Sequence, residues 1–126
     1  MEVNNCIFCN QKALKIENAY KFFIAIKDKF PVTDQHTLII TKRHVENYFD
    51  LTQEELHELN IILKEEKTLL EQSDSQIKGF NIGINQGVEA GQTVMHCHIH
   101  LIPRRIKDME HPEGGVRGVI PDKQKY

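Results

Sequence analysis

The stretch Gly91-Gln92-Thr93-Val94-Met95-His96-Cys97-His98-Ile99-His100-Leu101-Ile102-Pro103 contains three histidines that alternate with apolar residues. In a β-strand, successive side chains point to opposite faces. An extended conformation therefore places the imidazoles on one face and Met95, Cys97, Ile99 and Leu101 on the other. Next-but-one residues on a strand lie about 6–7 Å apart. The three rings are thus close enough to serve one small anion or metal ion.

Two chemical interpretations of these histidines remain open. In the first, His96 and His98 are metal ligands of a zinc hydrolase. In the second, one imidazole is a nucleophile or general base that its neighbours position. A structural, hydrogen-bonded role is the usual explanation for a single strand histidine, but it does not account for three at strict alternation. The pattern therefore favours a functional site.

The preceding loop, residues 85–93, favours phosphate chemistry. It follows a segment, residues 80–85, in which apolar residues alternate with polar or small ones, as in a strand. Its glycines allow the backbone to approach an anion closely, and Asn85, Gln92 and Thr93 add neutral donors. Preorganised donors of this kind stabilise charge that develops on phosphate oxygens. A zinc hydrolase would more naturally present a carboxylate base, and the loop contains a single acidic residue.

Residues 91–102 resemble the signature of the histidine triad (HIT) family, His-Φ-His-Φ-His-Φ-Φ, in which Φ is apolar. The resemblance extends from Cys6 to Pro103. It implies a nucleotide hydrolase or transferase that acts on the α-phosphate of a purine nucleotide conjugate through a covalent nucleotidyl-histidine. It also implies a homodimer in which the sheets of two subunits are joined.

The resemblance and the chemistry together suggest a role for each histidine. His98 is the expected nucleophile, His100 is expected to bind the phosphate oxygens, and His96 is expected to orient the strand and anchor it through a metal ion. In the family, an acid at the position of Asp28 contacts the ribose and a histidine at that of His36 lies beside the nucleotide. The residues expected at the nucleotide are Ile7, Phe8, Asp28, His36, Asn85, Gln92, Thr93, His98 and His100.

The N-terminal segment Cys6-Ile7-Phe8-Cys9 is a Cys-x-x-Cys pair. Such a pair can be redox-active, metal-binding or accidental. Zinc needs four ligands, so further residues are required, and His44 is a natural candidate. The family resemblance implies a structural Zn²⁺ site formed by Cys6, Cys9, His44 and His96.

The substrate branch is ambiguous. Asn85 and Thr93 are similar to residues of adenosine phosphoramidases, whereas the segment 89–94 and the absence of tryptophan are similar to dinucleoside polyphosphate hydrolases. The sequence slightly favours hydrolysis of diadenosine polyphosphates with release of AMP. A phosphoramidase and a non-catalytic nucleotide-binding adaptor are the alternatives.

The remaining pattern predicts an α+β fold. Strands are expected at residues 20–26 and 36–41, and a helix is expected to begin after Thr52, with Glu55 completing a capping box, and to end near Gln72. Short strands with one long helix between them favour an antiparallel sheet of about five strands, covered by that helix plus a short one. Residues 1–126 are expected to form a single domain.

The end of the chain, residues 104–126, is rich in glycine and basic residues and is expected to be a C-terminal arm. In similar bacterial proteins such an arm lies across the dimer partner near the active site. Arg104, Arg105 and Arg117 are therefore candidates to hold the distal phosphates of the substrate.

Composition limits the other classes of function. The 126 residues carry a net charge of −2, so their overall charge attracts neither nucleic acid nor membranes. No apolar run approaches the roughly 20 residues of a membrane span, and no signal peptide is evident. Three cysteines do not form a disulfide framework. We expect a protein of the cytoplasm whose partner is a small-molecule nucleotide.

Overall fold

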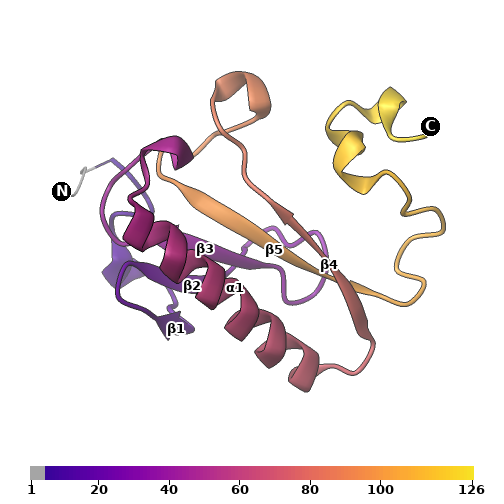
Figure 1. The fold of residues 1–126 in the computed structure, drawn as a ribbon, viewed down its shortest axis with the longest axis horizontal. Coiled ribbons are helices and arrows are strands. Elements are labelled where there is room, and N and C mark those ends of the chain that lie inside the picture. The colour runs from indigo at the N-terminus through magenta and orange to yellow at the C-terminus, as the bar shows by residue number, and fades with distance from the viewer. Residues whose placement is uncertain (1–4) are drawn as a thin grey trace.

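The computed structural model describes residues 5–126, in which five strands form one antiparallel sheet with a single α-helix across it (Figure 1). Across the sheet the strand order is β1-β2-β3-β5-β4. The strands are β1 (Asn18–Ala19), β2 (Phe23–Lys27), β3 (Thr37–Thr41), β4 (Ile77–Gly83) and β5 (His98–Arg105). The predicted α+β class and antiparallel sheet are confirmed.

The long helix α1 spans Gln53–Ser73 and has the predicted start. The Thr52 hydroxyl accepts a hydrogen bond from the Glu55 amide, and the Glu55 carboxylate accepts one from the Thr52 amide. Glu55 is buried and also accepts two hydrogen bonds from Arg43, each 2.8 Å long. These bonds hold the pKa of Glu55 below its usual value. The helix start is thereby fixed to the segment that follows β3.

The short second helix is present only as 3-10 turns within the described residues. They are η1 (Gln11–Ala13), η2 (Tyr48–Asp50), η3 (Val88–Ala90), η4 (Gly115–Val119) and η5 (Pro121–Lys123).

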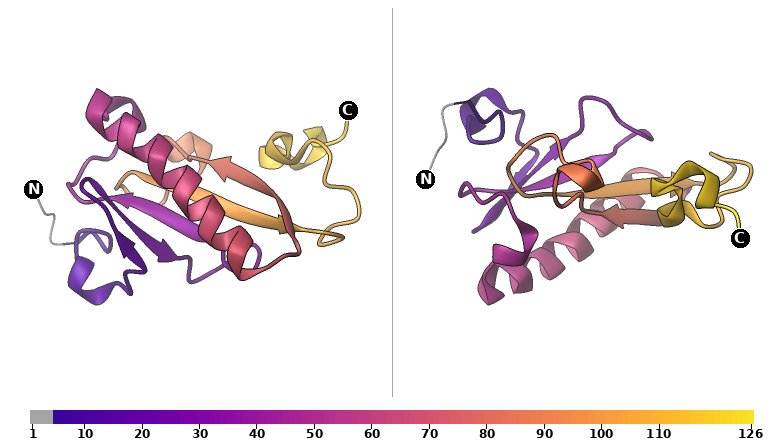
Figure 2. Two further views of the ribbon diagram at one scale, coloured as in Figure 1. Left: turned by 60° about the horizontal axis from the view of Figure 1, so that its bottom comes forward. Right: turned by 90° about the horizontal axis from the view of Figure 1, so that it is seen from above.

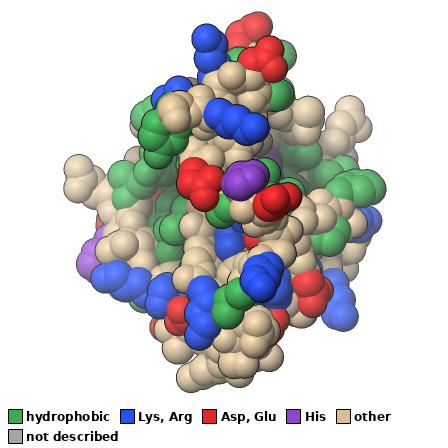
Figure 3. Space-filling model, turned by 90° about the vertical axis from the view of Figure 1, so that its right-hand side faces the viewer, with side chains coloured by type: hydrophobic (Ala, Val, Ile, Leu, Met, Phe, Trp, Pro, Cys, Tyr) green, Lys and Arg blue, Asp and Glu red, His purple; other side chains and the backbone are tan. Residues whose placement is uncertain are grey.

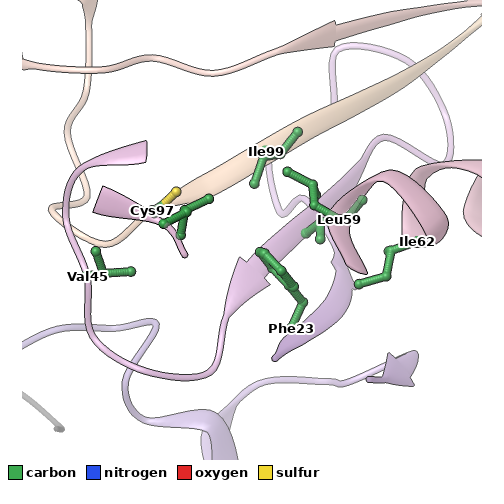
Figure 4. Close-up of a cluster of buried hydrophobic side chains, with 8 residues drawn as sticks. Phe23, Val45, Leu59, Ile62, Cys97 and Ile99 are labelled. Atoms are coloured by element: carbon green, nitrogen blue, oxygen red, sulfur yellow. The ribbon is translucent and has the colours of Figure 1, made fainter. Parts of the chain in front are cut away.

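The sheet has two buried faces. Helix α1 covers one of them, where Leu59 and Ile62 of the helix pack with Phe23, Cys97 and Ile99 (Figure 4). The N-terminal segment lies on the other side of the sheet from α1 (Figure 2). The apolar residues on that second face are Phe8, Ile24, Ile26, Leu38 and Ile40.

The register of β5 assigns two of the histidines to the second face. His98 is opposite Ile40 and His100 is opposite Leu38, and directly paired residues share a face of the sheet. Ile99 and Leu101 point toward α1 and are buried. Cys97 packs in the same cluster as Ile99, so the alternation predicted from the sequence holds for these residues.

The predicted strand is wrong at its beginning, because residues 95–97 are not extended β-structure. The amide of His96 donates to the carbonyl of Val94, and the amide of Cys97 donates to the carbonyl of Val45, 2.7 Å away. Regular pairing with β3 begins only at His98. His96 therefore precedes the paired part of β5, although its ring still contacts Phe8, as that of His98 does.

After β5 the chain forms the C-terminal arm, which contains η4 and η5. Arg104 donates to both carboxylate oxygens of Asp108 and to Asn81, and Arg105 donates to Asp74. On the side of the molecule that carries the arm, acidic and basic side chains are intermixed (Figure 3). Within residues 5–126, no helix has the length and apolar character needed to cross a membrane.

Candidate functional site

A cavity of about 530 Å³ opens on the sheet face opposite α1. Its size is in the range of small-molecule sites. Most of the residues predicted at a nucleotide line it, namely Ile7, Phe8, Asp28, Asn85, Gln92, Thr93, His98 and His100. The N-terminal segment, the end of β2, the loop before β5 and β5 itself thus converge on one space.

The orientation of His98 follows from a single hydrogen bond. Its Nδ1 lies 2.8 Å from the carbonyl oxygen of His96, so Nδ1 carries the hydrogen and donates it. The other nitrogen of the neutral ring, Nε2, then keeps its lone pair. Phe8 packs edge-on against the ring, with the centroids 5.1 Å apart. His98 is thus held at the cavity with a nucleophilic nitrogen available.

A short chain of hydrogen bonds fixes His100 in the tautomer opposite to that of His98, with the hydrogen on Nε2. The amide of Val32 donates to Nδ1 of His36 over 3.0 Å, so Nε2 of His36 carries the hydrogen. That Nε2 lies 2.9 Å from Nδ1 of His100 and donates to it. Nε2 of His100 is then the protonated nitrogen. It is buried and has no hydrogen-bond partner among residues 5–126.

Burial favours the neutral form of both imidazoles in this hydrogen-bond chain. It lowers the pKa of His36, and it lowers the pKa of His100 to about 4, with the neighbouring His98 and His36 adding to that effect. Asp28 lies 3.5 Å from Nε2 of His36. Asp28, His36 and His100 are close enough together to resemble a metal site. The two ring nitrogens of His36 are used in hydrogen bonds, however, so the group is a hydrogen-bond cluster.

His36 does not line the cavity. It is buried behind His100 and contacts that ring instead. The family resemblance implies a position beside the nucleotide for His36, whereas in the structure His100 lies between His36 and the cavity.

The loop before β5 is shaped by Gln92 and two glycines. The side-chain oxygen of Gln92 accepts from the Gly87 amide, and its NH₂ group donates to the carbonyls of Glu46 and Val94. Gly87 and Gly91 have φ values of +92° and +94°, which side chains rarely tolerate. Gln92 is buried and its amide is committed to the loop.

A second cluster contains the four residues predicted to bind zinc. One ligand atom from each of Cys6, Cys9, His44 and His96 can be chosen so that all four lie within 4.8 Å of one another. Nδ1 of His96 is 3.3 Å from Sγ of Cys6 and 3.5 Å from Sγ of Cys9, and Nδ1 of His44 is 3.2 Å from Sγ of Cys9. Tetrahedral zinc with ordinary bond lengths separates sulfur and nitrogen ligands by about 3.5 Å. The donor set and its spacing therefore fit Zn²⁺.

The tautomer of His96 also fits a metal ligand. Its Nε2 donates to the carbonyl of Thr41 over 2.8 Å, which leaves the lone pair on Nδ1, directed at the two sulfurs. His96 is fully buried and does not line the cavity. The three histidines therefore divide between two sites, with one in the metal cluster and two in the cavity.

Several cavity residues were missed by sequence reasoning. They are Asn10, Ala13, Leu14, Ile26, Lys27, Lys29, Phe30, Leu38 and Val94. Ile26 and Leu38 pair with each other and Leu38 pairs with His100, so knowledge of the strand register would have found them. Arg104, Arg105 and Arg117 do not line the cavity.

Comparison with known proteins agrees with this geometry. The family model described as HIT domain matches residues 13–107. An uncharacterized 16.1 kDa HIT-like protein of Mycoplasma pneumoniae is 42% identical over 110 residues, which are 82% of this chain and 74% of that protein. The asymmetrical bis(5'-nucleosyl)-tetraphosphatase of Schizosaccharomyces pombe is 41% identical over 78 residues, which are 62% of this chain and 42% of that enzyme.

Among solved structures, the Zn-bound histidine triad family protein of Mycobacterium smegmatis superposes with a TM-score of 0.76. The two are 31% identical, and the match covers 85% of this chain and 80% of that one.

We expect His100 to remain a neutral Nε2–H imidazole down to about pH 4, because its pKa is lowered by burial. In the unfolded chain a histidine has a pKa of about 6.5. The unfolded state therefore binds more protons between these values, so this group lowers the free energy of unfolding as the pH falls through that window. A ¹⁵N-resolved NMR titration of the imidazoles measures both the pKa and the tautomer. A normal pKa, or a hydrogen on Nδ1, would contradict the hydrogen-bond chain.

Proposed function

The chain belongs to the HIT family, and on this premise we propose that it hydrolyses dinucleoside polyphosphates, with release of AMP from a diadenosine polyphosphate. The observation that carries the proposal is the pairing of tautomers in one cavity. His98 keeps a lone pair on Nε2, and His100, whose Nε2–H is buried without a partner among residues 5–126, lines the same cavity. Cleavage of a phosphoanhydride bond needs a nucleophile at phosphorus and a hydrogen-bond donor to the phosphoryl oxygens, and these two rings would supply them.

In the first step, Nε2 of His98 attacks the α-phosphorus and forms an N–P bond. The bond between that phosphorus and the bridging oxygen breaks, and the leaving nucleotide departs with the electron pair. The Nε2–H of His100 donates a hydrogen bond to a phosphoryl oxygen, and this bond stabilises the negative charge that develops on that oxygen. In the second step, water attacks phosphorus, the N–P bond breaks, and AMP and neutral His98 are released together with a proton.

The rest of the cavity suits a nucleoside. Ile7, Phe8 and Leu14 provide apolar surface for a base, and the carboxylate of Asp28 can accept hydrogen bonds from ribose hydroxyls. Asn85 and Thr93 line the cavity as neutral donors for the phosphate chain. Gln92 supports this arrangement through the loop, since its own amide is occupied by backbone groups.

The name of the fission yeast relative supports a dinucleoside tetraphosphate as the substrate. The second candidate is an adenosine phosphoramidase, because Asn85 and Thr93, which line the cavity, are similar to residues of that branch. In a non-catalytic adaptor, the same residues would bind a nucleotide without turnover. A substrate panel separates the three possibilities.

We further propose that the Cys6, Cys9, His44 and His96 cluster holds a structural Zn²⁺, as supported by its donor set and by the Zn-bound relative. The ion would supply a cross-link between the N-terminal segment and the residues before β5. Thiolate ligands must stay reduced, which is the reason for proposing the cytoplasm as the location.

We also propose a homodimer in which β4 strands of two copies pair. β4 is at one end of the sheet order, so it offers unpaired backbone groups along its outer edge. The arm packs beside the same strand, since a Cβ on Gly115 would lie 3.4 Å from the side chain of Asn81. Pairing of two β4 strands would join the sheets and place each arm near the partner.

Substitution of His98 is expected to abolish turnover. The His98→Ala variant should lose about 10³-fold or more in kcat with diadenosine tetraphosphate, because no other ring presents a lone pair to the cavity. AMP release from this substrate and from an adenosine phosphoramidate should be measured, with quenched samples analysed by intact-protein mass spectrometry. His57→Ala, an exposed position on α1, is the matched control. Unchanged activity, or a nucleotidyl adduct that survives in His98→Ala, would refute the assignment, and turnover of neither substrate by the wild type would support the adaptor.

Zinc content is expected to be one ion per chain in protein purified without chelators. His44→Ala should lose the ion and about 3 kcal/mol or more of unfolding free energy, because metal binding and folding are coupled. Elemental analysis and denaturant titration measure the two effects, with His57→Ala again as the control. Full metal occupancy in His44→Ala would show that this histidine is not a ligand.

The mass in solution is expected to be twice the 14.7 kDa of one chain. Ile82→Lys, at a residue of β4 whose side chain is 52% exposed, should shift the protein toward the monomer, since a charge beside a strand edge opposes pairing. Ile61→Lys, at a 44% exposed position on α1, is the matched control. Light scattering distinguishes the states, and a wild-type mass of one chain would rule out the dimer.

A further inference from the structure

Phe30 is an exposed aromatic residue at the cavity. Its side chain lines the same space as His98, yet 86% of the residue is exposed. Single exposed apolar residues are common on protein surfaces and need no explanation by themselves. Phe30 differs because a ligand that fills the cavity would cover it.

The exposure of Phe30 does not come from a loosely held loop. The amide of Phe30 donates to the Asp28 carboxylate over 2.9 Å, and the amide of Val32 donates to His36 over 3.0 Å. Farther along the loop, the hydroxyl of Thr33 donates to the carbonyl of Pro103 over 2.7 Å. Pro31, between the first two of these anchors, restricts the backbone further. The loop is therefore tied to the sheet on both sides of the aromatic ring.

The position of Phe30 relative to the other cavity residues points to the nucleoside end of a ligand. It follows Asp28, the proposed ribose contact, by two residues. A second exposed apolar residue, Ile7, lines the cavity from the N-terminal segment and is 60% exposed. The phosphate groups belong at the other end, with His98 and His100. Two apolar side chains from separate segments thus border the space left for the base.

We propose that Phe30 is an aromatic platform that stacks on the nucleobase and gives the site a preference for purines. This inference rests on the proposed function, since it assigns the base specificity of the same cavity. A flat ring gains more contact from a bicyclic purine than from a monocyclic pyrimidine, because stacking increases with the overlapping area. The loop that holds Phe30 is already ordered, so little conformational entropy is lost when the base binds.

Fluorescence tests the contact directly, because the chain contains no tryptophan. In Phe30→Trp, titration with AMP should quench or shift the emission of the introduced indole, with UMP producing a smaller change. Val32→Trp is the matched control, since Val32 lies on the same loop and is 70% exposed but does not line the cavity. Equal responses of the two variants to AMP would overturn the proposal.

Calorimetry measures the effect on affinity without requiring turnover. Phe30→Ala should weaken AMP binding about five- to tenfold, the size expected for loss of one base–aromatic stack at an exposed site. UMP binding should weaken less, so the preference for the purine should shrink. Phe30→Tyr should restore AMP binding. Phe49→Ala, at an aromatic residue that is 79% exposed and does not line the cavity, should leave it unchanged.

The outcomes separate this inference from the proposed function. If AMP binds the wild type and Phe30→Ala equally well, Phe30 is not a platform, while the nucleotide site stands. If Phe30→Ala weakens the binding of AMP and the binding of UMP by the same factor, the ring contributes no purine preference and the proposal fails in that respect. If AMP does not bind the wild type at all, both this proposal and the proposed function fail.

Discussion

Each imidazole of the histidine triad has one ring nitrogen held by the fold, and this constraint determines what the other nitrogen can do. Nε2 of His96 donates to the Thr41 carbonyl, so Nδ1 faces the cysteines. Nδ1 of His98 donates to the His96 carbonyl, so Nε2 keeps a lone pair. Nδ1 of His100 accepts from His36, so Nε2 is a donor. Three identical side chains are thereby prepared for three different proposed roles, those of metal ligand, nucleophile and hydrogen-bond donor.

These hydrogen bonds depend on the position of β5 between β3 and β4. Pairing with β3 aligns His98 and His100 with Ile40 and Leu38, and the opposite face is filled by α1. Buried acids attach the helix to the rest of the chain, as Glu55 does with Arg43 and Glu66 does with Tyr20. Those contacts lie on the covered face, so the packing of the helix and the chemistry of the cavity use opposite sides of the sheet.

Much of this arrangement was predictable from local patterns. Alternation located the strand with His98 and His100, and the Thr52 capping box located the start of α1. The point at which β5 begins was not predictable, because it depends on the amide of Cys97 bonding to Val45, more than fifty residues earlier in the chain. The place of His36 behind His100 depends in the same way on strand register. Periodicity identifies the face of a residue, whereas contacts distant in sequence decide its partner.

The Cys-x-x-Cys segment encloses two residues of the cavity wall, since Ile7 and Phe8 lie between Cys6 and Cys9. A metal ion on the two sulfurs and a nucleoside against Phe8 would therefore restrain the same few bonds of backbone. If the bound ion strengthens nucleoside binding by some factor, the bound nucleoside must strengthen ion binding by the same factor, because the two binding equilibria form one thermodynamic cycle. Retention of the ion would then depend on how much of the protein is occupied by ligand.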